Sequence, residues 1–164
     1  MTLLLSTLST PIGNLNLIAD EHVLLAANLS NLKALKESLS QEDSERDVKN
    51  VSRIPIITDL ISDYFDGDIA ALNAISVRQP GAHFSQEAWK AMKKVKAGKV
   101  ISYGELAERA GSPAAVRAAG SACAKNAIVL IVPCHRIVKT GGALGNYAYG
   151  LDKKAWLLRH EGAL

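Results

Sequence analysis

Cysteine is scarce in this chain, which has 164 residues and only two thiols, Cys123 and Cys134. They lie eleven positions apart, without a Cys-x-x-Cys pair and without the spacing of a disulfide framework. We therefore expect free thiols in a reducing compartment. The same scarcity disfavours a zinc site, because the chain offers few other ligands at the spacing that a tetrahedral centre needs.

Long hydrophobic runs are also missing. The longest, residues 127–132, has the length of a core strand and falls short of the ~18 residues that span a bilayer. The first five residues contain no basic side chain and are followed by Ser6, so they predict a strand and not a signal peptide. With 48% hydrophobic residues, we expect a soluble, cytoplasmic, globular protein with no membrane partner.

Charge is distributed unevenly along the chain. Residues 1–83 carry 6 Lys and Arg against 11 Asp and Glu, whereas residues 84–164 carry 13 against 5, which leaves the chain at +3. A basic second half suggests a polyanionic partner, and ordinary surface variation is the alternative. Pro80-Gly81 marks the clearest linker. The predicted domains are an N-terminal α/β domain at 1–78, a linker at 79–83 and a C-terminal domain at 84–164.

The sequence of the first domain predicts a small antiparallel sheet with two helices. Turn chemistry separates its strand-like runs, and hydrophobic spacing sets the helices apart from them. The expected strands are residues 3–8, 15–19, 23–27 and 72–77, and the expected helices are 31–39 and 56–65. The polar stretch 40–50 predicts a surface loop.

The sequence of the second domain predicts mostly helices. Together with the sheet of the first domain, this makes the expected fold class α/β (α+β). The helices are expected at 84–95, 102–110, 114–125 and 152–160. Ser102 and Glu105 form a capping box, Ser112 and Pro113 suit the start of the following helix, and Asp152 suits the cap of the last. The middle two helices, joined by a turn with Gly111, predict a helix-turn-helix. A buried strand or extended segment is expected at 128–132 and a glycine-rich loop at 140–150.

Cys134 is the main candidate for chemistry. It follows an apolar run and precedes His135 and Arg136. A neighbouring imidazole or cation favours the thiolate, which is the nucleophilic form. The residues alone leave two alternatives open: a small buried hydrophobe, as most unpaired cysteines are, and a Cys-His hydrolase, for which the other histidines show no known arrangement.

The second helix of the predicted helix-turn-helix is poor in bulky side chains. Only Arg117 is long before Lys125 at its far end. Small residues allow close backbone approach to a minor groove, and Arg117 would fill the space that an extruded base leaves. A small-residue helix packed against its neighbours is the alternative.

Motifs in residues 84–164 resemble the O6-alkylguanine-DNA alkyltransferase family. They are Phe84 with Trp89, Ile101-Ser102-Tyr103, Ala115-Val116-Arg117-Ala118-Ala119-Gly120, Asn126, the signature Pro133-Cys134-His135-Arg136-Ile137-Val138, Gly145-Asn146-Tyr147 and Trp156-Leu157-Leu158-Arg159-His160-Glu161-Gly162. Residues 1–83 fit only the variable N-terminal domain of the family, through Ser9-Thr10-Pro11-Ile12-Gly13. The resemblance implies a ribonuclease H-like first domain before a helical domain that carries the helix-turn-helix.

The resemblance implies DNA repair by a single-turnover methylated-DNA–protein-cysteine S-methyltransferase. Such an enzyme binds the minor groove of double-stranded DNA, flips out O6-alkylguanine, or O4-alkylthymine, and takes the alkyl group irreversibly. Cys134 would be the acceptor and His135 the base, acting through a water and oriented by Glu161. Asn126 would brace the turn before the site, and Tyr103 would donate a hydrogen bond to the flipped guanine.

The remaining implied residues contact DNA or line the substrate pocket. The implied DNA contacts are Tyr103, Arg117, Ser112, Ala115, Ala118, Ser121, Ser85 and Thr140. The implied pocket residues are Pro133, Val138, Asn146, Tyr147, Ala148 and Tyr149. No cofactor and no metal are expected, because the family's zinc ligands are N-terminal cysteines and residues 1–83 contain none. We expect a monomer and leave open its cooperativity on DNA, its tolerance for large adducts and a lesion-binding role without transfer.

Overall fold

The computed structural model describes residues 2–164, which form two compact units. The first comprises the chain up to Pro80 together with Ala127–Ile131, and the second comprises Gly81–Asn126 with Val132–Leu164. The return of Ala127–Ile131 to the first unit was not predicted. The predicted domains at 1–78 and 84–164 stay a prediction, because compactness does not test whether each part folds by itself.

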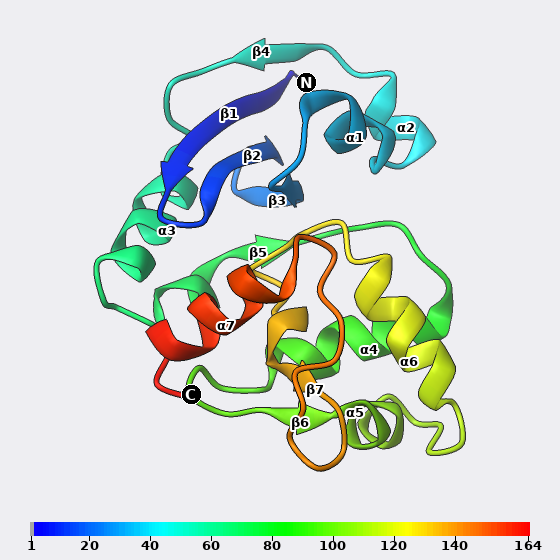
Figure 1. Cartoon of the computed structure of the whole chain (residues 1–164). Helices are drawn as coiled ribbons and strands as arrows, with labels where there is room; N and C mark the ends of the chain where they lie inside the picture. Colours follow the sequence, from blue (N-terminus) through cyan, green and yellow to red (C-terminus); the bar gives the residue numbers. More distant parts are fainter. Residues whose placement is uncertain (1) are drawn as a thin grey trace. The chain divides into compact units, whose positions relative to one another are not determined.

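The first unit is built on a five-stranded sheet in the order β4-β1-β2-β3-β5 (Figure 1). The strands are β1 (Leu3–Thr10), β2 (Gly13–Asp20), β3 (Val23–Asn28), β4 (Val48–Asn50) and β5 (Ser76–Val77). The three central strands are antiparallel, as predicted, but both edge strands pair in parallel, so the sheet is mixed. The predicted strand 72–77 is reduced to β5 after the short helix η1 (Ala71–Ala74).

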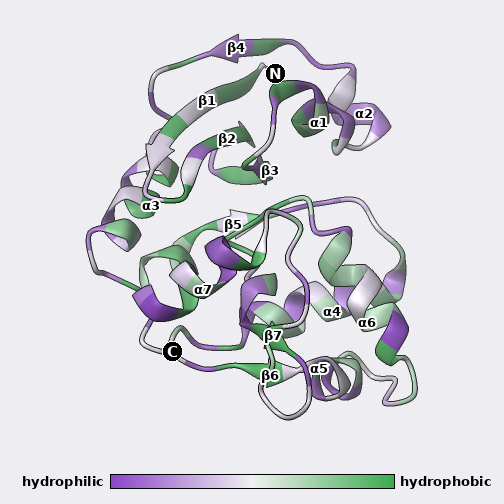
Figure 2. Cartoon of the chain, viewed as in Figure 1, coloured by the Kyte–Doolittle hydropathy of each residue, from purple (hydrophilic) through white to green (hydrophobic). Residues whose placement is uncertain are grey.

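Burial of apolar side chains explains why these strands hold together. Residues 15–19 of β2 are all buried, and Figure 2 shows β2 and β3 mainly in hydrophobic colours. Leu35 of helix α1 (Leu32–Glu37) joins Leu3, Leu5 and Leu25 in one core cluster. The helix begins there because the side chain of Asn31 accepts a hydrogen bond from the backbone N–H of Ala34 at 2.8 Å.

Two further helices complete this unit. Helix α3 (Ile57–Phe65) buries Ile57, Ile61 and Tyr64 on one face, as its spacing predicted. The predicted loop at 40–50 is wrong in part, because it contains helix α2 (Gln41–Ser44) as well as β4. Ser40 starts α2 by accepting a hydrogen bond from the backbone of Asp43. Both segments expose most of their side chains and are polar, so they lack the hydrophobic spacing that would have predicted a helix or a strand.

The second unit is mostly helical, as predicted, which confirms the α/β class. Its elements are α4 (His83–Lys93), β6 (Ile101–Ser102), α5 (Tyr103–Arg109), α6 (Val116–Ala124), η2 (Cys134–Arg136), β7 (Ile137–Val138) and α7 (Leu151–His160). Helices α4 and α6 are tied by the indole of Trp89, which donates a hydrogen bond to the carbonyl of Ala122 at 2.9 Å. Gly81 lies so near this ring that a Cβ there would be 2.5 Å from it.

Two predicted helix starts are wrong. Helix α6 begins at Val116 and not at residue 114, since Ser112 and Pro113 form a turn in which the Ser112 carbonyl accepts from Ala115. Helix α7 begins at Leu151 after Gly150, so Asp152 lies in its first turn and is not the cap. The predicted start of α5 is right, because Ser102 accepts a hydrogen bond from Glu105 at 3.0 Å.

The apolar run 128–132 is buried but is not a strand. Ile128 forms a single bridge with Ala27, and the chain then turns at Leu130, whose φ of 76° is incompatible with extended backbone. The hydrophobic run therefore predicted burial correctly and conformation wrongly. Within residues 2–164, no helix has the length and apolar character needed to cross a membrane.

Candidate active site

A cavity of about 610 Å³ lies beside Cys134, within the second unit. Its volume is in the range of ~300–1,000 Å³ that is usual for small-molecule sites. Its walls come from the start of α5, one face of α6 and the glycine-rich loop between β7 and α7, which is coloured orange in Figure 1. The lining residues are Tyr103, Val116, Arg117, Gly120, Ser121, Cys123, Ala124, Cys134, Lys139, Asn146, Tyr147 and Ala148.

Sequence reasoning named seven of these residues and missed five. Four of the missed residues, Val116, Gly120, Cys123 and Ala124, share the α6 face with Arg117 and Ser121, which the helical spacing of three and four residues could have shown. Nothing in the sequence around Lys139 indicated that it would line the cavity. Three predicted pocket residues do not line this cavity, and their pocket role stays a prediction; they are Pro133, Val138 and Tyr149.

Cys134 is the first residue of η2 and is only 9% exposed. Burial raises the pKa of its thiol, while a hydrogen bond from Asn126 and the charge of Lys154 lower it without cancelling that effect. The resting group is therefore a thiol, not the thiolate that its sequence neighbours suggested. The cation acting on the sulfur is Lys154, twenty residues away, and not Arg136.

His135 and Arg136, the two residues that follow Cys134, form a buried cluster with Glu161. His135 Nε2 lies 2.8 Å from Glu161 Oε2, and Arg136 donates to both oxygens of the same carboxylate at 2.8 and 2.9 Å. Arg136 also donates to the carbonyl of Val95 at 2.7 Å. Burial raises the pKa of Glu161, but the hydrogen bonds from His135 and Arg136 outweigh it and hold that pKa well below the usual range.

The protonation state of His135 follows from this cluster. Burial lowers its pKa, and the neighbouring Glu161 carboxylate only partly opposes the effect, so the ring is neutral at pH 7. Nε2 faces the carboxylate and carries the proton, which leaves the lone pair on Nδ1. Among residues 2–164, Nδ1 has no hydrogen-bond partner. A neutral imidazole next to a buried thiol is suited to act as a base.

Tyr103 is the first residue of α5 and lines the same cavity as Cys134. Its hydroxyl oxygen accepts a hydrogen bond from the backbone N–H of Asn146 at 3.4 Å. Burial raises the pKa of Tyr103, so the phenol remains a hydrogen-bond donor at neutral pH. Gly145, with φ of 77°, lets the loop approach this ring, since a Cβ there would lie 2.8 Å from the hydroxyl oxygen.

Asn126 connects the end of α6 with the segment that carries the thiol. Its side-chain amide donates a hydrogen bond to the carbonyl of Val132 at 2.7 Å. The contact spans six residues of chain and holds the backbone two residues before Cys134. This geometry supports the bracing role expected of Asn126.

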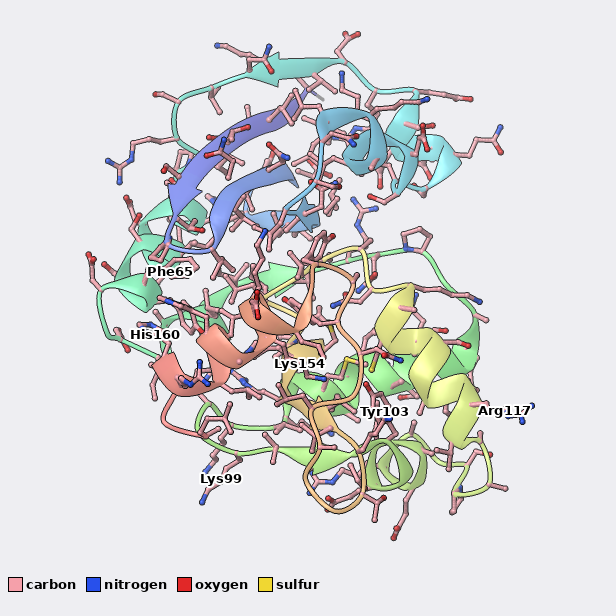
Figure 3. The ribbon with its side chains drawn as sticks, viewed as in Figure 1. Phe65, Lys99, Tyr103, Arg117, Lys154 and His160 are labelled. Atoms are coloured by element: carbon pink, nitrogen blue, oxygen red, sulfur yellow. The ribbon has the colours of Figure 1, made fainter. Side chains whose placement is uncertain are left out.

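The predicted DNA contacts are partly or fully exposed. Arg117, Ala118 and Ser121 lie on the open side of α6, and Figure 3 shows Arg117 projecting away from the body of the unit. Ser112 and Ala115 are half-buried in the turn before α6. Thr140 is exposed in the loop after β7, and Ser85 is half-buried in α4.

Comparisons of sequence place this arrangement among known proteins. Residues 83–163 match the family described as 6-O-methylguanine DNA methyltransferase, DNA binding domain. The methylated-DNA–protein-cysteine methyltransferase of Salmonella typhimurium is 35% identical over the whole of this chain and 98% of its own length. The Homo sapiens protein of the same name is 53% identical over 77 residues, which are 47% of this chain and 37% of that protein.

Comparisons of structure agree with the sequence. A Mycobacterium tuberculosis O6-methylguanine methyltransferase aligns with a TM-score of 0.77 and 30% identity, over 98% of this chain and 93% of its own. The protein from the same organism in complex with DNA aligns over the same shares with a TM-score of 0.79. With a 35% identical relative matched from end to end, this chain belongs to the methylated-DNA–protein-cysteine methyltransferase family of DNA-binding repair enzymes.

Proposed function

We propose that this chain repairs double-stranded DNA by taking the alkyl group of O6-alkylguanine onto Cys134, irreversibly and once per molecule. The observation that carries the proposal is one cavity bordered both by the Cys134 thiol and by α6 of the helix-turn-helix. A DNA-binding helix and a nucleophile that share one cavity support chemistry on a base. We extend the proposal to O4-alkylthymine, because the C–O bond to be broken is of the same kind.

The base has to leave its stack to reach the cavity, since a buried thiol cannot enter a duplex. Flipping a nucleotide costs a few kcal/mol, and the protein has to repay that cost with new contacts. The small residues of α6 favour close approach to the minor groove, and Arg117 at its exposed start would occupy the gap in the stack. Tyr103, which also lines the cavity, would donate a hydrogen bond to the flipped base.

The transfer needs a base because burial keeps Cys134 protonated. The thiol proton passes through a water to Nδ1 of His135, and Glu161 stabilises the imidazolium that forms. The sulfur attacks the alkyl carbon, the bond from that carbon to guanine O6 breaks, and its electron pair stays on guanine. A hydrogen bond from Tyr103 offsets the charge on the leaving base. The product is a thioether, and no cofactor takes part.

Titration of duplex DNA containing O6-methylguanine against the protein tests this proposal. The lesion should disappear in a one-to-one ratio with active protein and without turnover. Cys134→Ser should leave every lesion in place while still binding the duplex, whereas Cys123→Ser, which removes the other thiol, should still remove one equivalent.

Two other outcomes would contradict the proposal. A protein that binds damaged DNA and releases it unchanged would be a lesion-binding or regulatory protein. Repeated turnover on an acyl substrate, with both thiols intact afterwards, would indicate a Cys-His hydrolase.

A further inference from the structure

Lys154 is a fully buried lysine to which the mechanism above gives no part. It lies on α7, and its exposed fraction is 0%. Lysine is almost never buried completely unless its charge is matched, because an unmatched ammonium loses its hydration. We therefore expect hydrogen-bond acceptors around the Lys154 ammonium group that replace its hydration.

Three backbone carbonyls surround the ammonium group. Lys154 Nζ donates to Ile137 at 2.6 Å, to Leu144 at 2.5 Å and to Asn146 at 3.0 Å. An ammonium has three hydrogens, so each has one acceptor. Ile137 directly follows the helix that carries Cys134, and the other two acceptors belong to the loop that walls the cavity. One side chain thus joins α7, β7 and that loop.

The same ammonium group acts on two residues that line the cavity, Tyr103 and Cys134. Its Nζ is 5.9 Å from the ring centre of Tyr103, and Figure 3 shows both side chains in the middle of the unit. Its positive charge favours the ionised form of Cys134. The loop it holds includes Gly145, whose lack of a Cβ permits the contact with Tyr103.

We propose that Lys154 is a positioning residue for alkyl transfer, which fixes the part of the cavity wall formed by Asn146, Tyr147 and Ala148 before DNA binds. The inference rests on the proposed function, because it takes this cavity to be the site of the alkylated base. Lys154 does not touch the base itself. It acts through the three carbonyls and through its charge.

Single-turnover kinetics of Lys154→Met separates this role from general stabilisation. Methionine keeps the length of the side chain and removes the charge and all three donors. Each molecule reacts once, so the amplitude counts folded protein and the rate constant reports how well the reacting groups are placed. The substrates are duplex DNA containing O6-methylguanine and free O6-benzylguanine. The matched control is Lys153→Met, at the partly exposed neighbouring position of the same helix.

We expect Lys154→Met to lower the rate constant about tenfold or more on both substrates, as loss of positioning does. The dissociation constant for unreactive duplex and the amplitude per folded molecule should stay near those of the unaltered protein, and Lys153→Met should react like it. A reduced amplitude with an unchanged rate constant would overturn the inference, since Lys154 would then only stabilise the fold. If the unaltered protein transfers nothing, the proposed function fails instead.

A second measurement does not require the variant to fold. Acetylation of lysines by an N-hydroxysuccinimide ester, followed by peptide mass spectrometry of the unaltered protein, should label Lys154 far more slowly than Lys153. Equal labelling of the two would show that the ammonium is not held by the loop, and the inference would be wrong.

Discussion

His135 and Arg136 follow Cys134 directly in the chain, yet both side chains bind Glu161, which lies at the end of α7. One carboxylate therefore fixes the short helix that carries the thiol and also sets the tautomer of His135. The cluster is fully enclosed, so each partner depends on the others for its hydrogen bonds. Glu161 is the residue whose loss should disturb the site most.

Glu161→Gln should change the dependence of stability on pH. The pKa of Glu161 is lower in the folded protein than in the unfolded chain, so its stabilising contribution is complete above the usual carboxyl pKa of ~4.3. That contribution is lost as the pH falls towards the folded value. Glutamine should lower the free energy of unfolding at pH 7 by about 3 kcal/mol, as expected for a broken buried ion pair.

Urea denaturation at a series of pH values below about 5 measures this effect. The unaltered protein should lose stability steeply over that range, and the glutamine variant should lose less. Parallel curves for the two proteins would contradict the account of Glu161.

The sequence could predict these roles only in part. Cys134, His135 and Arg136 are adjacent and stood out directly, whereas Glu161 entered only through the family resemblance. Lys154 looked like one more lysine in a helix with several charges, since nothing local distinguishes a buried lysine from an exposed one. The thiolate expected from the sequence neighbours of Cys134 is not the resting form, because burial, which a sequence does not show, raises the pKa of the thiol more than Asn126 and Lys154 lower it.

At the scale of elements, the site depends on how α6 and the loop after β7 face one another. The loop contains several glycines with positive φ, and they differ in what surrounds them. Gly145 packs against Tyr103, whereas nothing lies within 4 Å of the position that a Cβ of Gly142 would take. A comparison of substitutions at Gly145 and Gly142 therefore separates the effect of backbone strain from the effect of contact with Tyr103.

Gly145→Ala should lower the rate of alkyl transfer more than Gly142→Ala does. Both replacements put a side chain on a left-handed backbone, at a cost on the order of 1–2 kcal/mol, but only the first pushes the loop away from Tyr103. Single-turnover rates and thermal unfolding of both variants provide the measurement. Equal rates for two equally stable variants would argue against the role of this contact.

Arg117→Ala tests α6 as the element that keeps a base out of the stack. The variant should transfer from duplex DNA about tenfold more slowly, a factor that ~1.4 kcal/mol produces. Its reaction with free O6-benzylguanine should change little, because no base has to be extruded. Comparison of the two rates is the measurement, and equal losses on both substrates would remove the proposed role of Arg117 in the stack.

Long, strongly patterned elements were predictable, and short ones were not. The central strands and α3 follow their hydrophobic spacing, while β4, β5 and α2 have two to four residues and depend on neighbours for their hydrogen bonds. The apolar run 128–132 was expected as a buried strand or extended segment of the second domain, but most of it packs in the first unit, because an apolar run specifies burial and not its partner.

For the molecule as a whole, charge separates the two halves of the sequence. Residues 84–164 carry an excess of eight positive charges, and residues 1–83 an excess of five negative ones. This pattern, which the sequence alone provides, fits an enzyme in which the later half contacts DNA. Cytoplasmic location and a monomeric state stay predictions.

Binding to undamaged duplex DNA should weaken steeply as salt rises, because Lys and Arg side chains displace counterions from phosphates. The reaction with free O6-benzylguanine should vary little over the same range, since the free base carries no phosphate. Fluorescence anisotropy with a labelled duplex measures the first and single-turnover rates measure the second. An affinity for duplex DNA that does not vary with salt would show that Lys and Arg side chains do not bind the phosphates.

Locating the adduct within the chain tests the central claim most directly. After reaction with duplex DNA containing O6-methylguanine, the protein is digested and its peptides are sequenced by tandem mass spectrometry. The account predicts one added methylene unit, all of it on Cys134, with Cys123 unmodified. Methylation of Cys123, or of no residue while the lesion persists in DNA, would contradict it.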